Sequence, residues 1–326
     1  MIAFGPVPSR RLGRSLGINN TAPRVCAYAC VYCQLGRTRK LQANRRAFLA
    51  PEAIAEAVLD KVERTGQEGE AIDYLSFVPD GEPTLDAALG REIEMLKPLG
   101  LPIAVISNAA LIWREDVRSD LMCANWVSLK VDSVDEAVWR RIDRPHGSLS
   151  LASILEGIVE FAGGYRGRLV TETMLVRGVN DGERQLEALA GFLSRVRPAR
   201  AYLSIPIRPP AEAWVQAPDE QSLHRAYHIL RERLEQVEYL IGYEGNAFAF
   251  TGEVVADLLS ITAVHPMRED AVEEYLARAR AEWGVVDDLV ARGQLVAVQY
   301  GGHTYYLRKL GTRPGTAHDS EGGGAA

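Results

Sequence analysis

Short apolar runs alternate with amphipathic stretches from about residue 70 to about residue 240 of the chain. The runs are rich in β-branched residues and end in polar or turn residues, as buried strands do. The longer stretches repeat apolar residues every three or four positions, as helices do. Regular alternation of strands and helices predicts parallel strands joined by helical crossovers.

The alternation predicts six strand–helix units. Strands are expected at 15–20, 71–79, 101–108, 125–132, 168–176 and 200–207. Helices are expected at 51–65, 85–99, 114–122, 134–142, 151–162, 183–196 and 219–237. The predicted fold class is therefore α/β, a partial (β/α)6 barrel like that of a TIM barrel.

The pattern changes beyond about residue 250. Helical periodicity at 253–262, 267–283 and 285–293 precedes two alternating runs that Gly301 and Gly302 separate, which is a strong hairpin signal. Three helices and a hairpin predict a small winged-helix-like domain. We therefore expect a barrel domain over 1–250, the winged-helix-like domain over 251–310 and a disordered tail over 311–326.

The amino-acid composition indicates the cellular compartment of the protein. The 326 residues are 47% hydrophobic and 25% charged, as in a soluble globular protein with a sizeable core. No run approaches the roughly 18 apolar residues of a membrane-spanning helix, and the first residues lack the apolar segment of a secretory signal. We therefore expect a cytoplasmic protein without a membrane partner, in a compartment where thiols stay reduced.

Charge is unevenly distributed along the chain. The net charge is −6, yet residues 1–50 contain no Asp or Glu. They contain Arg10, Arg11, Arg14, Arg24, Arg37, Arg39, Lys40, Arg45 and Arg46. This basic segment either attracts an anionic cofactor, substrate or nucleic acid, or pairs with acidic groups of the barrel helices.

Three of the four cysteines, Cys26, Cys30 and Cys33, lie within eight residues at C-x3-C-x2-C spacing. Clustered cysteines in a reducing compartment indicate metal or redox chemistry. Structural zinc takes four ligands, so zinc would need a distant fourth ligand, and His146 is the first histidine. An iron–sulfur cluster fits better, because three thiolates leave one iron of a four-iron cluster open to a reactant. Unligated cysteines are the remaining alternative.

The cysteine spacing, with the aromatic Tyr32 just before the third cysteine, resembles the signature of the radical S-adenosylmethionine enzymes. The resemblance implies a partial barrel of the radical SAM type, with Cys26, Cys30 and Cys33 as ligands of a [4Fe-4S] cluster. Its open iron binds the amino and carboxylate groups of S-adenosylmethionine, and Tyr32 lies near the adenine. It also implies a 5′-deoxyadenosyl radical that takes hydrogen from a substrate, and a flavodoxin-like or ferredoxin-like electron donor.

A second motif, Asp80-Gly81-Glu82-Pro83, follows a predicted strand and resembles the family's GGEP turn, which binds the methionyl amino group. Gly81 permits close backbone approach, and Glu82 supplies negative charge near an ammonium group. Asp80 stands where the family has glycine.

Further polar residues follow other predicted strands, and such strand ends meet on one face of a barrel. Ser107 and Asn108 match the family's polar pair after the third strand. Asp132 and Glu172 are expected to meet ribose hydroxyls or the substrate. The alternative for each is a satisfied polar group at a strand end.

Several phrases over residues 1–240, such as "RIDRPHGSL" and "MLVRGVND", resemble the branch that contains the wyosine-forming tRNA enzymes. Those enzymes carry upstream cysteines for a second cluster and a lysine that condenses with pyruvate. This chain has no cysteine before Cys26 and no lysine before Lys40, which disfavours that reaction. The substrate stays unknown, with tRNA or a peptide as candidates.

The remaining candidates each have two interpretations. Cys123 either donates a hydrogen atom or is a buried structural cysteine. Arg144 and His146 are candidates for binding an anion or moving a proton, with a loop salt bridge as the alternative. Arg208 either holds a carboxylate or phosphate or belongs to a stiff proline loop.

The winged-helix-like domain is acidic, with Glu269, Asp270, Glu273, Glu274, Asp287 and Asp288 on its predicted helices. A nucleic-acid binder presents a basic face, so we expect a protein or peptide contact, an intramolecular cover or dimerisation instead. A different class of function is also open: a non-catalytic iron–sulfur or zinc regulator that uses this domain as its effector.

Overall fold

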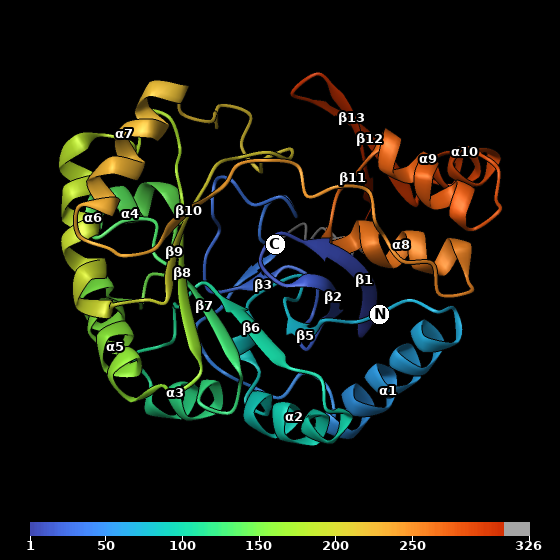
Figure 1. Cartoon of the computed structure of the whole chain (residues 1–326), viewed down its shortest axis with the longest axis horizontal. Helices are drawn as coiled ribbons and strands as arrows, with labels where there is room; N and C mark the ends of the chain where they lie inside the picture. The colour runs from blue at the N-terminus through green and yellow to red at the C-terminus, as the bar shows by residue number, and fades with distance from the viewer. Residues whose placement is uncertain (310–326) are drawn as a thin grey trace, which may run out of the picture.

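The computed structural model of the chain describes residues 1–309. Its centre is an eight-stranded curved sheet with helices along the outer face (Figure 1). The α/β class and the mostly parallel sheet are confirmed. The expected tail over 311–326 lies outside the described residues.

Seven strands of the sheet are parallel, and β1 (Ala3–Ser9) runs antiparallel at one edge. The parallel strands, in spatial order, are β2 (Gly13–Ile18), β5 (Tyr74–Phe77), β6 (Ile103–Ser107), β7 (Trp126–Lys130), β8 (Arg168–Met174), β9 (Arg200–Ser204) and β10 (Val237–Leu240). Within residues 1–309, β1 and β10 do not pair with each other. The sheet is therefore a barrel that is open on one flank.

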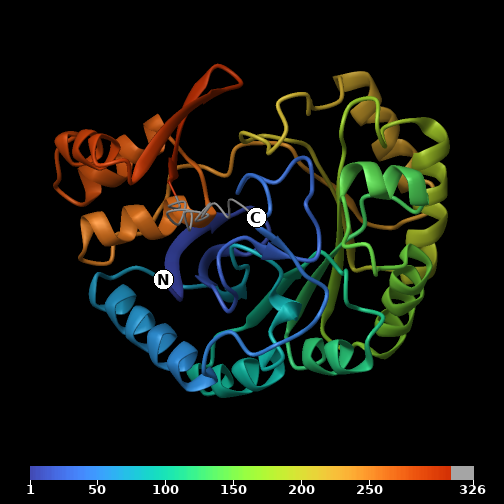
Figure 2. The same ribbon diagram turned by 180° about the vertical axis from the view of Figure 1, so that it is seen from behind.

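The crossover helices cover the outer face of this sheet. They are α1 (Pro51–Gln67), α2 (Leu89–Leu96), α3 (Glu115–Leu121), α4 (Glu136–Ile142), α5 (Leu151–Gly164), α6 (Glu183–Val196) and α7 (Glu220–Arg231). Figures 1 and 2 show α1, α2, α3, α5 and α6 following one another along that face. None of the helices within residues 1–309 is both long enough and apolar enough to cross a membrane.

Helix α1 shows how the sequence specifies these elements. Pro51 occupies the first turn, where backbone N–H groups have no partner within the helix, so the N–H that proline lacks is not needed. Ile54, Val58, Lys61 and Thr65 recur at three- and four-residue spacing and are buried, which places one stripe of the helix against the core.

The sequence pattern does not predict β1, β10 or the short pair β3 (Val25–Cys26) and β4 (Lys40–Leu41). Strand β10 has four residues, three of them only partly buried, and follows α7 closely, so it carries no clear strand pattern. In β1, Pro6 interrupts the pattern, and the pairing register shifts between Phe4 and Val7. The expected six parallel strands are thus extended to seven by β10.

The C-terminal residues form helices and a second sheet beside β1, at the upper right of Figure 1. The elements are α8 (Val254–Val264), β11 (Met267–Arg268), α9 (Glu269–Arg278), α10 (Gly284–Ala291), β12 (Leu295–Tyr300) and β13 (His303–Arg308). The expected hairpin is confirmed, and its turn residues Gly301 and Gly302 have φ of 57° and 79°. Phe4 and Val7 of β1 join Ile261 and Met267 in one hydrophobic cluster.

A buried ion pair also joins the two parts of the chain. Lys61 of α1 donates from Nζ to Asp257 Oδ1 of α8 at 2.6 Å and to Thr251 Oγ1 at 2.5 Å. Asp257 also accepts from the Thr251 backbone N–H at 2.7 Å. Only 11% of the Lys61 side chain and 3% of the Asp257 side chain are exposed, so neither charge has water as an alternative partner.

Substituting Lys61 by Met (K61M) leaves the Asp257 carboxylate buried without its cation. We expect the free energy of unfolding to fall by about 3 kcal/mol, measured by urea denaturation. Lys97→Met is the matched control, because Lys97 pairs with Glu94 on the surface, and it should change the free energy by less than about 0.5 kcal/mol. Equal effects of the two substitutions would show that the buried pair does not join α1 to α8.

Candidate functional site

A cavity of about 350 Å³ lies at the carboxyl ends of the first parallel strands. The loop after β2, the turn after β5 and the end of β6 meet there. The predicted site residues in its walls are Cys26, Cys30, Tyr32, Cys33, Gly81, Glu82, Ser107 and Asn108. The topology of the sheet therefore brings together motifs that are about 80 residues apart in the sequence.

The three cysteines are free and half-buried in the segment between β2 and α1, where Cys26 ends β3 and the other two lie on the loop after it. Two tight turns shape this loop, with N–H···O bonds of 3.1 Å from Cys33 to Cys30 and from Gly36 to Cys33. Burial raises the pKa of all three thiols, so a metal is needed to hold them as thiolates at neutral pH. Within residues 1–309 no three Cys, His, Asp or Glu side chains gather around one metal ion. Thiolates that bind different irons of one cluster need no such single centre.

Polar groups surround two of the sulfur atoms. Asn108 Nδ2 donates to Cys26 Sγ at 3.3 Å, and the Tyr28 backbone N–H donates to the same sulfur at 3.5 Å. The Cys30 thiol donates to Asp143 Oδ1 at 3.3 Å. Donors to cysteine sulfur favour the thiolate and tune a cluster that it holds.

Glu82 is a buried carboxylate that accepts four hydrogen bonds. The donors are the Thr84 backbone N–H at 3.1 Å, Thr84 Oγ1 at 2.6 Å, Ser107 Oγ at 2.7 Å and the Asn108 backbone N–H at 2.8 Å. Burial raises the pKa of Glu82, and these donors oppose the shift. The carboxylate therefore fixes the turn after β5 against the end of β6.

Gly81 occupies a position without room for a side chain. A Cβ atom there would lie 2.1 Å from the Val25 carbonyl oxygen and 3.0 Å from Thr21 Oγ1. The turn can therefore approach the loop that carries Cys26 closely, as long as residue 81 is glycine.

Lys130, which the sequence analysis does not single out, lines the cavity beside Tyr32. Its Nζ lies 4.9 Å from the centre of the Tyr32 ring and 3.3 Å from Glu172 Oε1. Although burial opposes it, the charges of Asp132 and Glu172 raise the pKa of Lys130 overall, so the ammonium persists. Lys130 is the one charged residue of β7, and a charge in a buried strand is the sequence feature that could have identified it.

Glu172 also pairs with Arg11. A contact of Glu172 with a ribose or the substrate stays a prediction. Burial acts to raise its pKa, but the charges of Arg11 and Lys130 outweigh burial and lower it to about 2. Glu172 is thus a carboxylate shared by two cations in the wall of the cavity.

The walls of the cavity do not include Asp80, Pro83 or Asp132, and each of these has a structural partner instead. Asn19 bonds both the backbone N–H of Asp80, at 2.6 Å, and its carboxylate. The Pro83 carbonyl accepts from Asn20 Nδ2 at 3.3 Å. Asp132 accepts from the Tyr32 hydroxyl and, at 2.7 Å, from the Met174 backbone N–H. A cofactor contact by these three residues stays a prediction.

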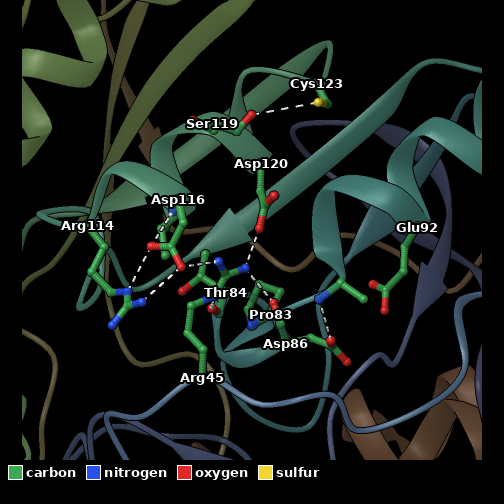
Figure 3. Close-up of polar contacts among 12 residues, drawn as sticks. Arg45, Pro83, Thr84, Asp86, Glu92, Arg114, Asp116, Ser119, Asp120 and Cys123 are labelled. Atoms are coloured by element: carbon green, nitrogen blue, oxygen red, sulfur yellow. Dashed lines mark hydrogen bonds and ion pairs between the residues drawn. The ribbon is translucent and has the colours of Figure 1, made fainter.

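Three further sequence candidates, Cys123, Arg144 and His146, lie away from the cavity walls. Cys123 is half-buried at the end of α3, and its thiol donates to the Ser119 carbonyl at 3.7 Å (Figure 3). Arg144 pairs with Glu212 at 2.6 Å, as the salt-bridge interpretation expects. His146 Nδ1 lies 2.8 Å from Ser148 Oγ. Arg208, in contrast to these three residues, lines the cavity.

Arg45 belongs to the basic segment, but only 6% of its side chain is exposed, which excludes it from a nucleic-acid surface. Figure 3 shows it between the turn after β5 and α3. It donates to the Thr84 carbonyl at 2.9 Å and the Asp86 carbonyl at 2.6 Å, and it pairs with Asp116 and Asp120. Arg45 therefore holds the backbone of the turn that carries Glu82.

Substituting Arg45 by Gln (R45Q) leaves the carbonyl groups of the turn without their donor and Asp120 without its cation. We expect the free energy of unfolding in urea to fall by about 3 kcal/mol. Arg114→Gln is the matched control: Arg114 pairs with the same Asp116 but is 35% exposed, so we expect a loss below about 1 kcal/mol. An R45Q loss no larger than that of R114Q would contradict the role assigned to Arg45.

Glu92 of α2 is a second buried carboxyl behind the turn (Figure 3). Asn20 Nδ2 donates to its Oε2 at 3.0 Å. Burial, and then the charge of Asp86, raise the pKa of Glu92 to about 8, while the Asn20 bond opposes the shift. The folded protein therefore holds this carboxyl protonated at neutral pH.

A raised pKa in the folded state stabilises the fold below the pKa of the unfolded state, and this contribution is lost as pH rises through the folded value. Glutamine mimics the protonated carboxyl and does not titrate. As the pH rises from 5 to 8, the free energy of unfolding of Glu92→Gln (E92Q) should therefore rise by roughly 2–4 kcal/mol relative to that of the unchanged protein. Urea unfolding at each pH measures this difference. Glu52→Gln changes an exposed carboxylate and should show no comparable gain. A pH-independent difference for E92Q would overturn the assignment.

Comparison with known proteins identifies the family. The sequence profile of the Radical SAM superfamily matches residues 21–190, a range that includes the three cysteines, the turn after β5 and Lys130. The chain therefore belongs to the radical SAM superfamily. It is 44% identical over 314 residues to the UPF0026 protein MJ1312 of Methanocaldococcus jannaschii, covering 96% of this chain and 97% of that protein.

Two further comparisons agree with this family. A UPF0026 protein of Helicobacter pylori is 34% identical over 211 residues, which covers 64% of this chain and 67% of that protein. The structure of TYW1 with a lysine-pyruvate adduct bound superposes with a TM-score of 0.53 at 19% identity, and covers 68% of this chain and 74% of that chain. This likeness shows a shared fold.

Radical SAM enzymes use a [4Fe-4S] cluster and S-adenosylmethionine, and these are the cofactors of this chain. The residues of the cavity fit both groups. Three cysteines free of disulfides lie in one wall, and Asn108 donates to one of the sulfurs. Gly81 leaves the backbone accessible at the turn, and Lys130 supplies a cation suited to a carboxylate.

Proposed function

We propose that this chain is an enzyme that cleaves S-adenosylmethionine reductively and directs the resulting 5′-deoxyadenosyl radical to take hydrogen from an organic substrate. One observation carries the proposal. In a chain of the radical SAM superfamily, three free cysteines and the Gly81-Glu82 turn form walls of a single cavity. Such a cavity can bring a cofactor and a substrate together and exclude bulk water.

In this proposal Cys26, Cys30 and Cys33 bind three irons of the cluster, which leaves the fourth iron for the amino and carboxylate groups of S-adenosylmethionine. When bound, the cluster supplies the electron that breaks a sulfonium carbon–sulfur bond. The thiolates need support in a buried site, and Asn108 provides it by donating to Cys26.

Three cavity residues are assigned to S-adenosylmethionine itself. Gly81 lets a backbone carbonyl approach the methionyl ammonium, and Glu82 sets the position of that turn through its four hydrogen bonds. Lys130 offers a persistent cation to the carboxylate. The ring of Tyr32, held by Asp132, offers a flat surface to the adenine.

The C-terminal elements are proposed to act as a winged-helix-like module that covers the open flank of the barrel. The side chain of Gln34, next to Cys33, donates to the Val264 carbonyl at 2.9 Å. Tyr300 and Tyr305 of the hairpin donate to the Pro206 and Ile207 carbonyls at 3.1 Å and 2.9 Å. These contacts favour an intramolecular cover over a nucleic-acid reader.

The proposal needs a source of low-potential electrons and a reducing compartment. We assign the electron to a flavodoxin-like or ferredoxin-like carrier, and the enzyme to the cytoplasm. Lys40 is exposed beside the cysteine loop and would attract an acidic carrier.

A tRNA-modifying reaction of the wyosine type remains the alternative within the family. A lysine that condenses with pyruvate must lose its proton to attack a carbonyl. Lys130 lines the cavity, but the charges of Asp132 and Glu172 raise its pKa and hold it as an ammonium group. The two carboxylates beside Lys130, at 3.8 Å and 3.3 Å, therefore favour a substrate that does not form an imine with it. A non-catalytic regulator, the other alternative, would release no 5′-deoxyadenosine.

Anaerobic reconstitution with iron and sulfide tests the proposal. The unchanged protein should bind about four irons per chain and, when reduced with dithionite, should release 5′-deoxyadenosine from S-adenosylmethionine. Cys30→Ala (C30A) should lose most of the bound iron, measured by iron analysis. Its release of 5′-deoxyadenosine, measured by chromatography, should fall roughly 100-fold or more. Cys123→Ala is the matched control and should retain both, because Cys123 lies outside the cavity walls.

The outcomes separate the ligand assignment from the chemistry. A C30A protein that keeps its iron and its turnover would refute Cys30 as a ligand. An unchanged protein that binds the cluster but neither changes its spectrum nor releases 5′-deoxyadenosine with S-adenosylmethionine would support the regulator instead. A colourless protein that binds zinc would remove the cluster as well.

A further inference from the structure

Three arginines lie together on the open flank of the cavity. Arg10 and Arg11 belong to the turn between β1 and β2, and Arg208 follows β9. The cationic residues of the cavity walls are Arg10, Arg11, Lys130 and Arg208, and the carboxylates are Glu82, Glu172 and Glu244. Glu82 is already held by the strand ends, so two carboxylates, Glu172 and Glu244, remain to face four cations.

These charges are unequally paired. Arg11 and Lys130 share Glu172, and Arg208 pairs with Glu244. Arg10 has neither a hydrogen-bond partner nor an ion-pair partner among residues 1–309. It is an exposed residue at the mouth of the cavity, whereas only 13% of the Arg208 side chain is exposed.

Arg208 is held from several sides but is not saturated. Its guanidinium donates to Gln34 Oε1 at 2.6 Å and lies 3.0 Å from His265 Nε2. Its buried Nε has no hydrogen-bond partner among the described residues, and neither has Glu244 Oε2. One N–H donor and one carboxylate oxygen are thus left without a partner at this flank.

Like charges at this flank repel one another. Burial and then the charge of Arg10 lower the pKa of Arg208 to about 10, and Arg11 adds to the shift. Burial, Arg208 and Arg10 also lower the pKa of His265 well below its usual value, so the imidazole stays neutral and accepts from Arg208. An anion at this flank would offset the repulsion among the three guanidinium groups.

We infer that Arg10 and Arg208 bind the anionic group, a carboxylate or a phosphate, of a small substrate at the flank of the cavity. This inference rests on the proposed function, because it assigns a substrate class to the same site. A small molecule fits better than a nucleic-acid backbone, since Gln34 and the Tyr300–Tyr305 hairpin close around Arg208. A nucleic acid requires a broad exposed basic face instead.

The carboxylate of S-adenosylmethionine has a different cation available. Lys130 lies over the ring of Tyr32, which immediately precedes Cys33. Arg10 and Arg208 lie with Glu244 and His265, on the side of the cavity next to the C-terminal elements. We therefore assign Lys130 to the cofactor, and Arg10 and Arg208 to the substrate.

The test uses the full-length, anaerobically reconstituted protein and measures binding by isothermal titration at moderate salt. Inorganic phosphate and succinate are the two probes, so that the tighter one distinguishes a phosphate-bearing from a carboxylate-bearing substrate. Arg10→Gln (R10Q) should weaken the tighter probe roughly tenfold, and Arg10→Lys should restore part of the affinity. Arg14→Gln is the matched control from the same hairpin, because Arg14 pairs with Asp73 outside the cavity.

The expected result is that R14Q binds the probe like the unchanged protein, and that saturating S-adenosylmethionine does not displace it. Equal affinity in R10Q and R14Q would overturn the inference. Displacement of the probe by S-adenosylmethionine would also overturn it, because the arginines would then belong to the cofactor, and displacement by bulk tRNA at equal ionic strength would replace the small substrate by a nucleic acid.

Release of 5′-deoxyadenosine in the absence of substrate separates this inference from the proposed function. It should persist in R10Q, whose substitution leaves the cysteines and the turn after β5 unchanged. If the unchanged protein released none while R10Q still lost anion affinity, the anion site would stand and the radical chemistry would fall. If release were normal and no probe bound, only the anion site would fall.

Discussion

One buried carboxylate, that of Glu82, sets the geometry on which the site depends. Its four hydrogen bonds hold the turn after β5 against the end of β6. Asn108, fixed by one of these bonds, donates in turn to the Cys26 sulfur. A charge that is taken out of water needs nearly complete satisfaction by fixed donors, so any movement of these strand ends is costly. The cavity is therefore preorganised before any cofactor binds.

The basic segment shows why charge alone does not reveal a role. Arg14 and Arg45 both pair with acidic side chains, one on the surface and one buried beneath the turn. Arg10 and Arg11, in the same segment, face the cavity instead. The sequence displays these arginines as equivalent positive charges, and only the packing of the surrounding elements separates structural pairing from ligand recognition.

Most of the sheet and the three cysteines could be predicted because their signals are local. Parallel strands such as β6 are nearly continuous apolar runs, and the cysteine spacing lies within eight residues. Strand β10 escaped prediction because it is short and only partly buried, so its position depends on the neighbouring β9.

The polar partners at the site escaped prediction for a related reason. The contact of Arg45 with Thr84 joins residues 39 positions apart, and that of Lys130 with Glu172 joins residues 42 positions apart. Asp132 follows a strand as expected, yet its orientation towards Met174 and Tyr32 follows from packing that no sequence pattern records. Strand ends thus indicate where a site lies, but not which side chains face into it.

The open flank between β1 and β10 has a consequence for substrate selectivity. The segment after β2 and the ends of β5 and β6 carry the cysteines and the Gly81-Glu82 turn, whereas Val264 and His265, from the elements after residue 250, line the cavity near Gln34 and Arg208. Substitutions on that side of the cavity can therefore alter which substrate binds, while the cysteines and the turn after β5 keep their positions.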